Sequence, residues 1–197
     1  CNSYKHTIVI TNRHLVQGDF LKQLEKVTKL HPHALILREK DLTDDAYESL
    51  AKKVFDLCER EDITFFLHTK IEIARKIGCQ NIHLSIPVLK GLSETEKKAL
   101  TEDFCEISIS CHSMEDVEIA MAGGATQIIL GTIFETECKK GVLGKGVEFV
   151  REICQKCPLP VYAIGGMNLQ RLPLVIDAGA AGCCMMSGFM QTTKPLQ

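Results

Sequence analysis

The sequence predicts an α/β protein folded as a compact (β/α)8 TIM barrel. Short apolar runs alternate with helical patterns eight times along the 197 residues. Several runs are apolar throughout, as parallel strands covered on both faces usually are. No GxGxxG motif follows the first run, which removes the main reason to expect an open dinucleotide-binding sheet. We expect one domain spanning residues 1–197, near the lower size limit for this barrel.

Each expected strand is a short run rich in β-branched and aromatic residues. The runs cover residues 7–12, 34–38, 64–68, 81–85, 106–111, 127–131, 161–165 and 182–187. Helical spacing and capping residues mark segments between them, at 43–61, 113–124 and 168–179. After Ser187 only "GFMQTTKPLQ" remains. We therefore expect the final helix to be short or missing, with that side of the barrel bare or covered by a second subunit in a homodimer.

Composition narrows the function class. The net charge is −2 and no basic block occurs, so no nucleic-acid partner is expected. No apolar run is long enough to span a membrane, and the first residues, "CNSYKHTIVI", lack the pattern of a signal peptide. We expect a cytoplasmic protein with no membrane partner.

Ten cysteines are spread through the hydrophobic segments rather than spaced as a disulfide framework. We expect them to be reduced thiols that pack as small apolar side chains. Cys154 and Cys157 form the single CxxC pair, and a redox or zinc role for this pair is the remote alternative.

Polar residues follow the carboxyl ends of nearly all the expected strands, where ligands bind in this fold. Glycines occur after the last two strands, in "AIGGM" and "MMSG", the place where such barrels commonly hold a phosphate. The candidate phosphate-binding residues are Gly165, Gly166, Met186, Ser187 and Gly188.

Two cations and two histidines are further candidates. Arg38 and Lys40 alternate along the second strand, so both can face the ligand while Glu39 points to the other side. His112, after the fifth strand, can give and take a proton near neutral pH. His68 ends the third strand and is the second candidate for this role. His83 lies inside the fourth strand and is consistent with a core position.

The segments "LREK", "SCHSMEDVEIAMAGGATQIILGTIFETECKKG", "PVYAIGGMN" and "AGAAGCCMMSGF" together resemble the thiamine phosphate synthase superfamily. Within it, "GTIFETECKKGVLGKGVEFV" and "IGGMNLQRL" are most similar to the thiazole tautomerase branch. The resemblance covers nearly the whole chain. It implies a thiazole phosphate substrate, bound by the strand-end residues Arg38, Lys40, His68 and Ser110. Thr136, Cys138 and Lys139, in the loop after the sixth strand, complete the substrate-binding candidates, and Cys138 stands where the family has a threonine.

The synthase of this superfamily joins hydroxymethylpyrimidine diphosphate to a thiazole phosphate and uses Mg²⁺. The family has an Asn-Asp pair after the third strand and another Asp past the fourth, and at these positions this sequence has His68, Thr69 and, by spacing, Val88. Thr and Val are poor substitutes for the oxygen ligands of a hard cation. The resemblance therefore implies a retained phosphate site without the metal ligands, and we expect no metal and no cofactor.

The tautomerase converts a thiazole carboxylate phosphate from its exocyclic-alkene form to the aromatic form. It needs a phosphate anchor, a carboxylate contact and a proton shuttle, and its catalytic histidine corresponds to His112. We therefore expect a thiazole tautomerase of thiamine (vitamin B1) biosynthesis. A thiamine phosphate synthase with an altered Mg²⁺ site, and a non-catalytic binding protein for thiazole or thiamine phosphate, stay open as alternatives.

Overall fold

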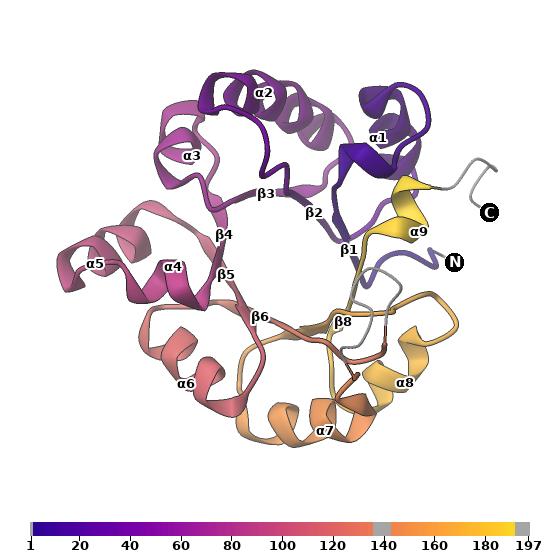
Figure 1. The fold of residues 1–197 in the computed structure, drawn as a ribbon, viewed down its shortest axis with the longest axis vertical. Helices are drawn as coiled ribbons and strands as arrows, with labels where there is room; N and C mark the ends of the chain where they lie inside the picture. Colours follow the sequence, from indigo (N-terminus) through magenta and orange to yellow (C-terminus); the bar gives the residue numbers. More distant parts are fainter. Residues whose placement is uncertain (1, 136–142, 192–197) are drawn as a thin grey trace.

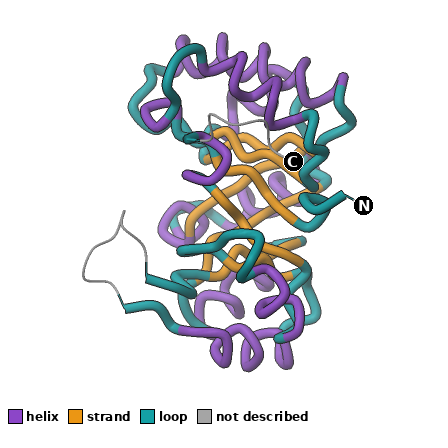
Figure 2. Tube along the Cα trace, turned by 90° about the vertical axis from the view of Figure 1, so that its right-hand side faces the viewer, coloured by secondary structure: helices purple, strands orange, loops and turns teal. Residues whose placement is uncertain are grey.

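The computed structural model describes residues 2–135 and 143–191. Eight parallel strands form a closed barrel in sequence order, with each strand paired to the next and β1 paired to β8. The strands are β1 (Thr7–Ile10), β2 (Ala34–Leu37), β3 (Thr64–His68), β4 (Asn81–Ser85), β5 (Glu106–Cys111), β6 (Gln127–Leu130), β7 (Val161–Ala163) and β8 (Gly182–Met185). Figure 1 looks into this ring, and Figure 2 shows the strands enclosed between helices. The predicted fold class is confirmed.

Helices surround the strands on the outside of the barrel (Figure 1). In chain order they are η1 (Arg13–Leu15), α1 (Phe20–Thr28), α2 (Asp44–Arg60), α3 (Ile71–Ile77), α4 (Ile86–Lys90), α5 (Glu94–Asp103), α6 (Met114–Ala122), α7 (Gly146–Lys156), α8 (Leu172–Asp177) and α9 (Ser187–Met190). The hydroxyls of Thr43 and Ser113 cap α2 and α6 by accepting hydrogen bonds from Ala46 N and Asp116 N. Both helices therefore begin where the sequence predicts.

The prediction for residues 168–179 places the start of the helix too early. The Asn168 side chain accepts a hydrogen bond from Arg171 N at 2.9 Å and closes a turn, and α8 begins only at Leu172. Pro173 then lies in the first turn of the helix, where its missing N–H costs nothing.

The first two expected strands end two and one residues early, and the last three end one, two and two residues early. Gly165 has a φ of +106°, which extended backbone does not adopt, so β7 ends at Ala163. Ser187 is already the first residue of α9, so β8 ends at Met185. β6 ends at Leu130, directly before Gly131.

The short final helix is also observed. α9 has four residues, and it buries Phe189 and Met190. The Tyr4 and Phe189 rings lie 5.6 Å apart between centroids, and the Gln23 amide donates to the Phe189 carbonyl at 2.7 Å. The N-terminal segment and α1 therefore cover this side of the barrel together with α9. The homodimer stays a prediction.

Two apolar clusters form the core. The larger lies between the strands and the helices. The smaller comes from alternate residues of six strands and fills the barrel interior: Ile8, Ile10, Ala34, Ile36, Phe66, Ile129, Tyr162 and Cys184. β4 and β5 contribute no side chain to it. Their inward positions carry His83, Ser108 and Ser110, so one side of the interior is polar.

The cysteines of the described residues are free thiols. Burial raises the pKa of Cys154 to about 11, with Cys157 adding to the effect, so this thiol is protonated at neutral pH. Cys157 is buried and its Sγ lies 3.8 Å from the Leu159 carbonyl. Both thiols of the CxxC pair pack at the end of α7. No helix in the described part of the chain is both long and apolar enough to cross a membrane.

Candidate active site

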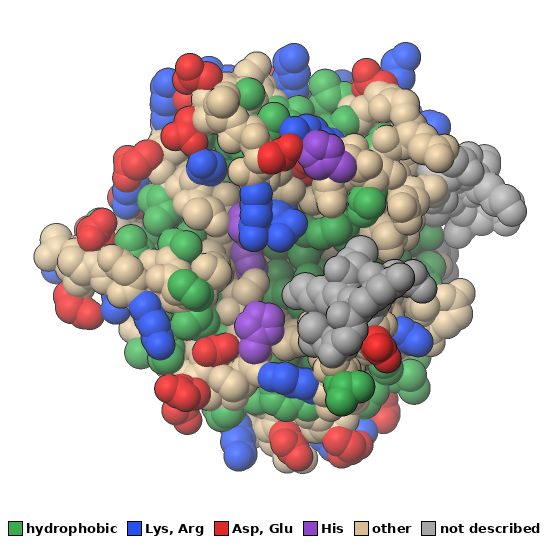
Figure 3. Space-filling model, in the orientation of Figure 1, with side chains coloured by type: hydrophobic (Ala, Val, Ile, Leu, Met, Phe, Trp, Pro, Cys, Tyr) green, Lys and Arg blue, Asp and Glu red, His purple; other side chains and the backbone are tan. Residues whose placement is uncertain are grey.

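The candidate residues gather at the carboxyl ends of the strands. Seen down the barrel, Lys or Arg side chains and His side chains lie next to one another near the centre of this face (Figure 3). The strand ends bring Arg38, His68, Ser110 and His112 to this mouth of the barrel, from β2, β3 and β5.

His112 follows β5 and is exposed at the mouth. Its Nδ1 lies 2.9 Å from the carbonyl oxygen of Gly131, the residue after β6. A carbonyl oxygen can only accept, so Nδ1 carries the hydrogen. In the neutral ring Nε2 then holds a lone pair, and no described residue forms a hydrogen bond with it. The contact therefore fixes the tautomer of the neutral ring and leaves the lone pair on Nε2.

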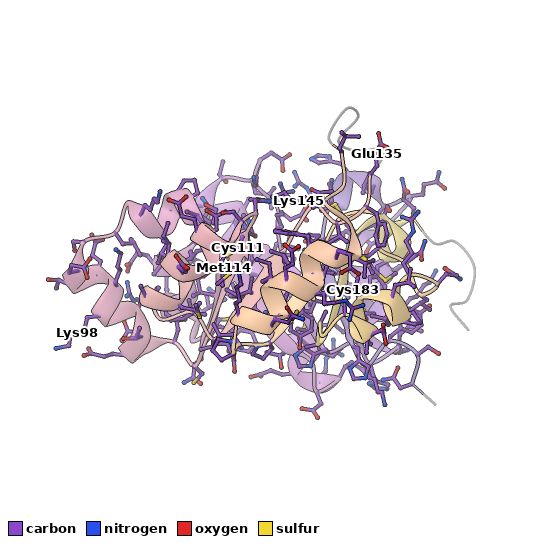
Figure 4. All side chains as sticks on the ribbon, turned by 90° about the horizontal axis from the view of Figure 1, so that it is seen from below. Lys98, Cys111, Met114, Glu135, Lys145 and Cys183 are labelled. Atoms are coloured by element: carbon purple, nitrogen blue, oxygen red, sulfur yellow. The ribbon has the colours of Figure 1, made fainter. Side chains whose placement is uncertain are left out.

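Two further contacts hold the backbone of His112. Its N–H donates to Asp116 Oδ2 at 2.8 Å, in the first turn of α6. Its carbonyl accepts from the Lys145 ammonium, which arrives from the residue before α7. The Lys145 ammonium also lies 4.7 Å from the Phe149 ring centroid. Figure 4 shows Lys145 close to the barrel and Glu135 at the outer edge of the molecule. Contacts from α6 and from the segment before α7 thus fix the backbone of the proton shuttle candidate.

The segment after β2 places two cations beside the histidines. Arg38 is half-buried, Lys40 is exposed, and Glu39 between them is buried at 3% exposure. The Glu39 carboxylate turns away from the mouth and accepts from Thr11 Oγ1 at 2.6 Å and from Arg13 N at 2.9 Å. This is the alternation that the sequence predicts. Because a buried carboxylate needs such partners, Glu39 anchors the segment that carries both cations.

Arg13 completes this anchor. Its guanidinium contacts Glu39 Oε1 at 3.1 Å and forms two hydrogen bonds to Asp41, at 2.6 and 2.8 Å. The Arg13 contact, followed by one from His14, holds the pKa of the Asp41 carboxyl well below its usual range. Asp41 is therefore ionised at any pH at which the protein would be assayed, and it pairs with Arg13 throughout.

His68 and His83 stack in the mouth, with ring centroids 5.4 Å apart. Burial lowers the pKa of His68 to about 4, and the charges of Arg38 and Lys40 add to this effect. Burial lowers the pKa of His83 to about 3, with contributions from His68 and Arg38. Both rings are neutral at neutral pH. His68 Nδ1 lies 3.0 Å from Thr69 Oγ1, its neighbour in sequence.

Gly165 and Gly166 both have positive φ, +106° and +61°. A Cβ at Gly165 would lie 2.5 Å from Thr132 Cγ2 and 3.0 Å from Ile133 N, and one at Gly166 would lie 2.9 Å from Glu135 O. The Phe134 N–H donates to the Gly165 carbonyl at 3.0 Å. The β7 loop thus packs its backbone against the segment after β6, and both requirements select glycine.

Arg171 holds the β7 loop from the other side. Its Nη1 donates to the Gly166 carbonyl at 2.6 Å, and its guanidinium lies 4.4 Å from the Phe134 ring centroid. Beyond β8, Met186 is partly buried, while Ser187 and Gly188 are exposed at the start of α9. These residues of the last two loops lie on the mouth side of their strands, as predicted, and a phosphate role for them stays a prediction.

Thr136, Cys138 and Lys139 lie outside the described residues. In residues 2–135 and 143–191 no group of three or more His, Cys, Asp or Glu side chains is arranged to hold a metal ion. Val88 lies in α4, where it packs against the larger core cluster.

Three residues that hold the candidate site in place were not predicted from the sequence. The sequence indicates only that Glu39 faces away from the ligand, whereas in the structure it anchors the segment that carries Arg38 and Lys40. Lys145 and His83 carry no local signal, because their partners are far away in sequence: His112 for Lys145, and Ser108 and Ser110 for His83.

Comparison with known proteins identifies the family. The family model described as thiamine monophosphate synthase matches residues 7–189, nearly the whole chain. The chain belongs to the thiamine monophosphate synthase family.

Two relatives illustrate the match. The chain is 30% identical over 180 residues to the thiamine-phosphate synthase of Coprothermobacter proteolyticus, covering 91% of this chain and 84% of the relative. It is 29% identical over 182 residues to the putative thiamine-phosphate synthase 2 of Aquifex aeolicus, covering 92% and 96%. The thiamine phosphate pyrophosphorylase structure from Pyrococcus furiosus shares the fold, with a TM-score of 0.83 and 24% identity, over 98% of this chain and 91% of that one.

Membership in this family changes which of the functions expected from the sequence is better supported. The family and the names of the relatives bear out a thiamine-biosynthesis protein of the synthase family. They favour the synthase alternative over the tautomerase that the sequence analysis put first.

Proposed function

We propose that this family member is a thiazole tautomerase, which aromatises a thiazole carboxylate phosphate by proton transfer through His112. The observation that carries the proposal is the Nδ1 contact of His112 with the Gly131 carbonyl, because it leaves Nε2 as a base at the mouth of the barrel. This is an acid–base site, and it is built without a charged partner for the ring among the described residues.

The reaction needs one proton to move between two carbons. When an exocyclic C=C bond becomes part of an aromatic ring, the saturated ring carbon loses a proton and the exocyclic carbon gains one. Nε2 of neutral His112 takes the first proton, and the imidazolium so formed delivers it to the second carbon, so no net charge or proton is lost. The Gly131 carbonyl keeps its hydrogen bond in both states and stabilises the cation.

The remaining candidates anchor the substrate in this proposal. Arg38 and Lys40 supply positive charge to its anionic groups, and Ser110 and His68 supply hydrogen bonds. The backbone of the glycine loops, with Met186 and Ser187, receives the phosphate. Thr136, Cys138 and Lys139, which lie outside the described residues, are proposed to bind the substrate.

The side chains at the family's carboxylate-bearing positions support this choice. His68 contacts Thr69 and stacks on His83, and Val88 packs against the larger core cluster. None of these three positions carries a carboxylate, so the residues do not fit a carboxylate-held Mg²⁺ there. The proposed reaction requires no metal and no cofactor.

A thiamine phosphate synthase is the second candidate, and the printed names of the relatives favour it. It would join hydroxymethylpyrimidine diphosphate to thiazole phosphate, with Mg²⁺ held differently from the family pattern. A protein that binds thiazole phosphate without turnover would be the remaining outcome.

The test is a pair of assays on one preparation. Aromatisation of the thiazole carboxylate phosphate is followed in EDTA, and formation of thiamine phosphate is followed with Mg²⁺ and both synthase substrates. We expect aromatisation in EDTA and no condensation. Mg²⁺-dependent condensation without aromatisation would replace the first candidate with the second.

A further inference from the structure

A buried polar chain runs through the barrel interior from β6 to the mouth. The Gln127 amide nitrogen donates to Ser108 Oγ at 3.0 Å. Ser108 Oγ lies 2.8 Å from His83 Nδ1, and His83 Nε2 lies 2.7 Å from Ser110 Oγ. His83 is 4% exposed, Ser108 is fully buried and Gln127 is 5% exposed. The chain plays no part in the proton transfer proposed above.

The hydrogens of this chain can be assigned by counting donors. Ser108 accepts from the Gln127 amide, and the acceptor available to its own hydrogen is His83 Nδ1. The His83 ring is buried beside Arg38 and His68, which keeps it neutral with a single N–H hydrogen. That hydrogen is therefore on Nε2, which donates to Ser110 Oγ. If Nδ1 carried it instead, two donors would meet at Ser108 and the Ser108 hydrogen would lack an acceptor.

This assignment also sets the orientation of the Ser110 hydroxyl group. Its oxygen receives the His83 hydrogen, so its own hydroxyl hydrogen is free to be donated into the mouth. Ser110 is half-buried and lies two residues before His112. Residues two apart along a strand face the same side, so both positions face the same side of β5 and its continuation. A ligand group that meets Ser110 is then offered a donor.

We infer that His83 is a positioning residue which, with Ser108 and Gln127, holds Ser110 as a hydrogen-bond donor and so favours a hydrogen-bond acceptor of the ligand, such as a carboxylate or phosphate oxygen, at this point. A ligand with an N–H donor there would leave the Ser110 hydroxyl hydrogen without an acceptor. The identity of the ligand rests on the proposed function, whereas the direction of the chain does not.

The orientation of the hydrogen bonds in this chain is tested by measuring which ring nitrogen of His83 carries the hydrogen. Long-range ¹H–¹⁵N NMR of the ¹⁵N-histidine-labelled protein at neutral pH separates the two neutral forms. We expect the hydrogen of His83 on Nε2, and we expect Ser108→Ala to reduce this preference. A hydrogen on Nδ1 in the unmodified protein would overturn the inference, whatever the protein is found to catalyse.

The consequence for binding is tested with two matched substitutions. The amide nitrogen of His83→Gln can reach the position of Nε2, whereas His83→Asn places its amide near Nδ1 only. Titration with the aromatic thiazole carboxylate phosphate should give a Kd about 10-fold weaker for His83→Asn and within about 3-fold of the unmodified protein for His83→Gln. Urea unfolding of both variants separates loss of fold from loss of the contact.

A double-mutant cycle shows whether His83 acts through Ser110. In a Ser110→Ala background the effect of His83→Asn on Kd should vanish, because the hydroxyl that it orients is gone. Independent effects of the two substitutions would overturn the positioning role. Failure of the unmodified protein to bind the probe would count against the proposed function, and the NMR result would still decide the inference.

Discussion

The Nδ1 of His112 lies 2.9 Å from the carbonyl oxygen of Gly131, and this contact links the ends of the neighbouring strands β5 and β6 at the barrel mouth. The same histidine is held through its backbone by Asp116 and Lys145. The ring therefore has a fixed tautomer and orientation before any ligand arrives. Such a fixed position is what the proposed proton shuttle requires.

Replacing His112 with Asn should reduce aromatisation at least about 100-fold, because no other group described at the mouth offers a base in the same position. The Kd for the aromatic product should change little. Steady-state kinetics and product titration measure the two effects. His31→Asn is the matched control, because His31 is exposed in the turn before β2, at the opposite end of the barrel. Full activity of His112→Asn would contradict the assignment.

Glu39→Gln should destabilise the protein by roughly 1–3 kcal/mol, because it weakens the buried contacts with Thr11 and Arg13. Urea unfolding measures the change. Glu72→Gln is the control: its pair with Arg75 is on the surface, with the Glu72 side chain 83% exposed, and should be worth less than about 1 kcal/mol. Equal effects of the two substitutions would show that Glu39 is not an anchor.

Gly165→Ala should cost roughly 2–5 kcal/mol in free energy of unfolding, from the positive φ and from the clash of Cβ with Thr132 and Ile133. Gly18→Ala separates the two causes. Gly18 has a φ of +92° but nothing within 4 Å of its Cβ position, so it should lose only the conformational part, roughly 1–2 kcal/mol. A Gly165→Ala variant as stable as Gly18→Ala would mean that the β7 loop is not packed on the segment after β6.

Stability should fall as the pH drops from about 6.5 toward 4. The folded-state pKa values of His68 and His83, about 4 and about 3, lie below the unfolded value near 6.5. In this window the unfolded chain binds protons that the folded chain does not, so acid favours unfolding. Each histidine contributes a slope of up to roughly 1.4 kcal/mol per pH unit.

Urea unfolding at about pH 7 and about pH 5 measures this slope above the range in which most carboxylates titrate. His83→Gln should flatten it, whereas His31→Asn should leave it unchanged. An unchanged slope in His83→Gln would mean that His83 is not held neutral by the fold.

The sequence predicts the barrel well because its signals are local. Each strand is a short apolar run bounded by turn residues, and Thr43 and Ser113 mark helix starts that the structure reproduces. The predicted start of α8 was wrong because Asn168 closes a turn instead of capping the helix. α4 and α5 follow β4 as two short helices, and no sequence prediction was made for them.

The site was predictable only in part. Strand ends point to the mouth, so Arg38, His68, Ser110 and His112 are found from position alone. The roles of Glu39, Lys145 and His83 depend on contacts 28, 33 and 25 to 27 residues away in the chain. Such contacts are set by strand register and by the path of the loops around the barrel, which no local pattern contains.

The most direct test of the central claim compares the two reactions of this family on the same purified protein. The account predicts that the protein aromatises the thiazole carboxylate phosphate in EDTA, that His112→Asn abolishes most of this activity, and that Mg²⁺ with both synthase substrates yields no thiamine phosphate. Mg²⁺-dependent thiamine phosphate formation without aromatisation would contradict it.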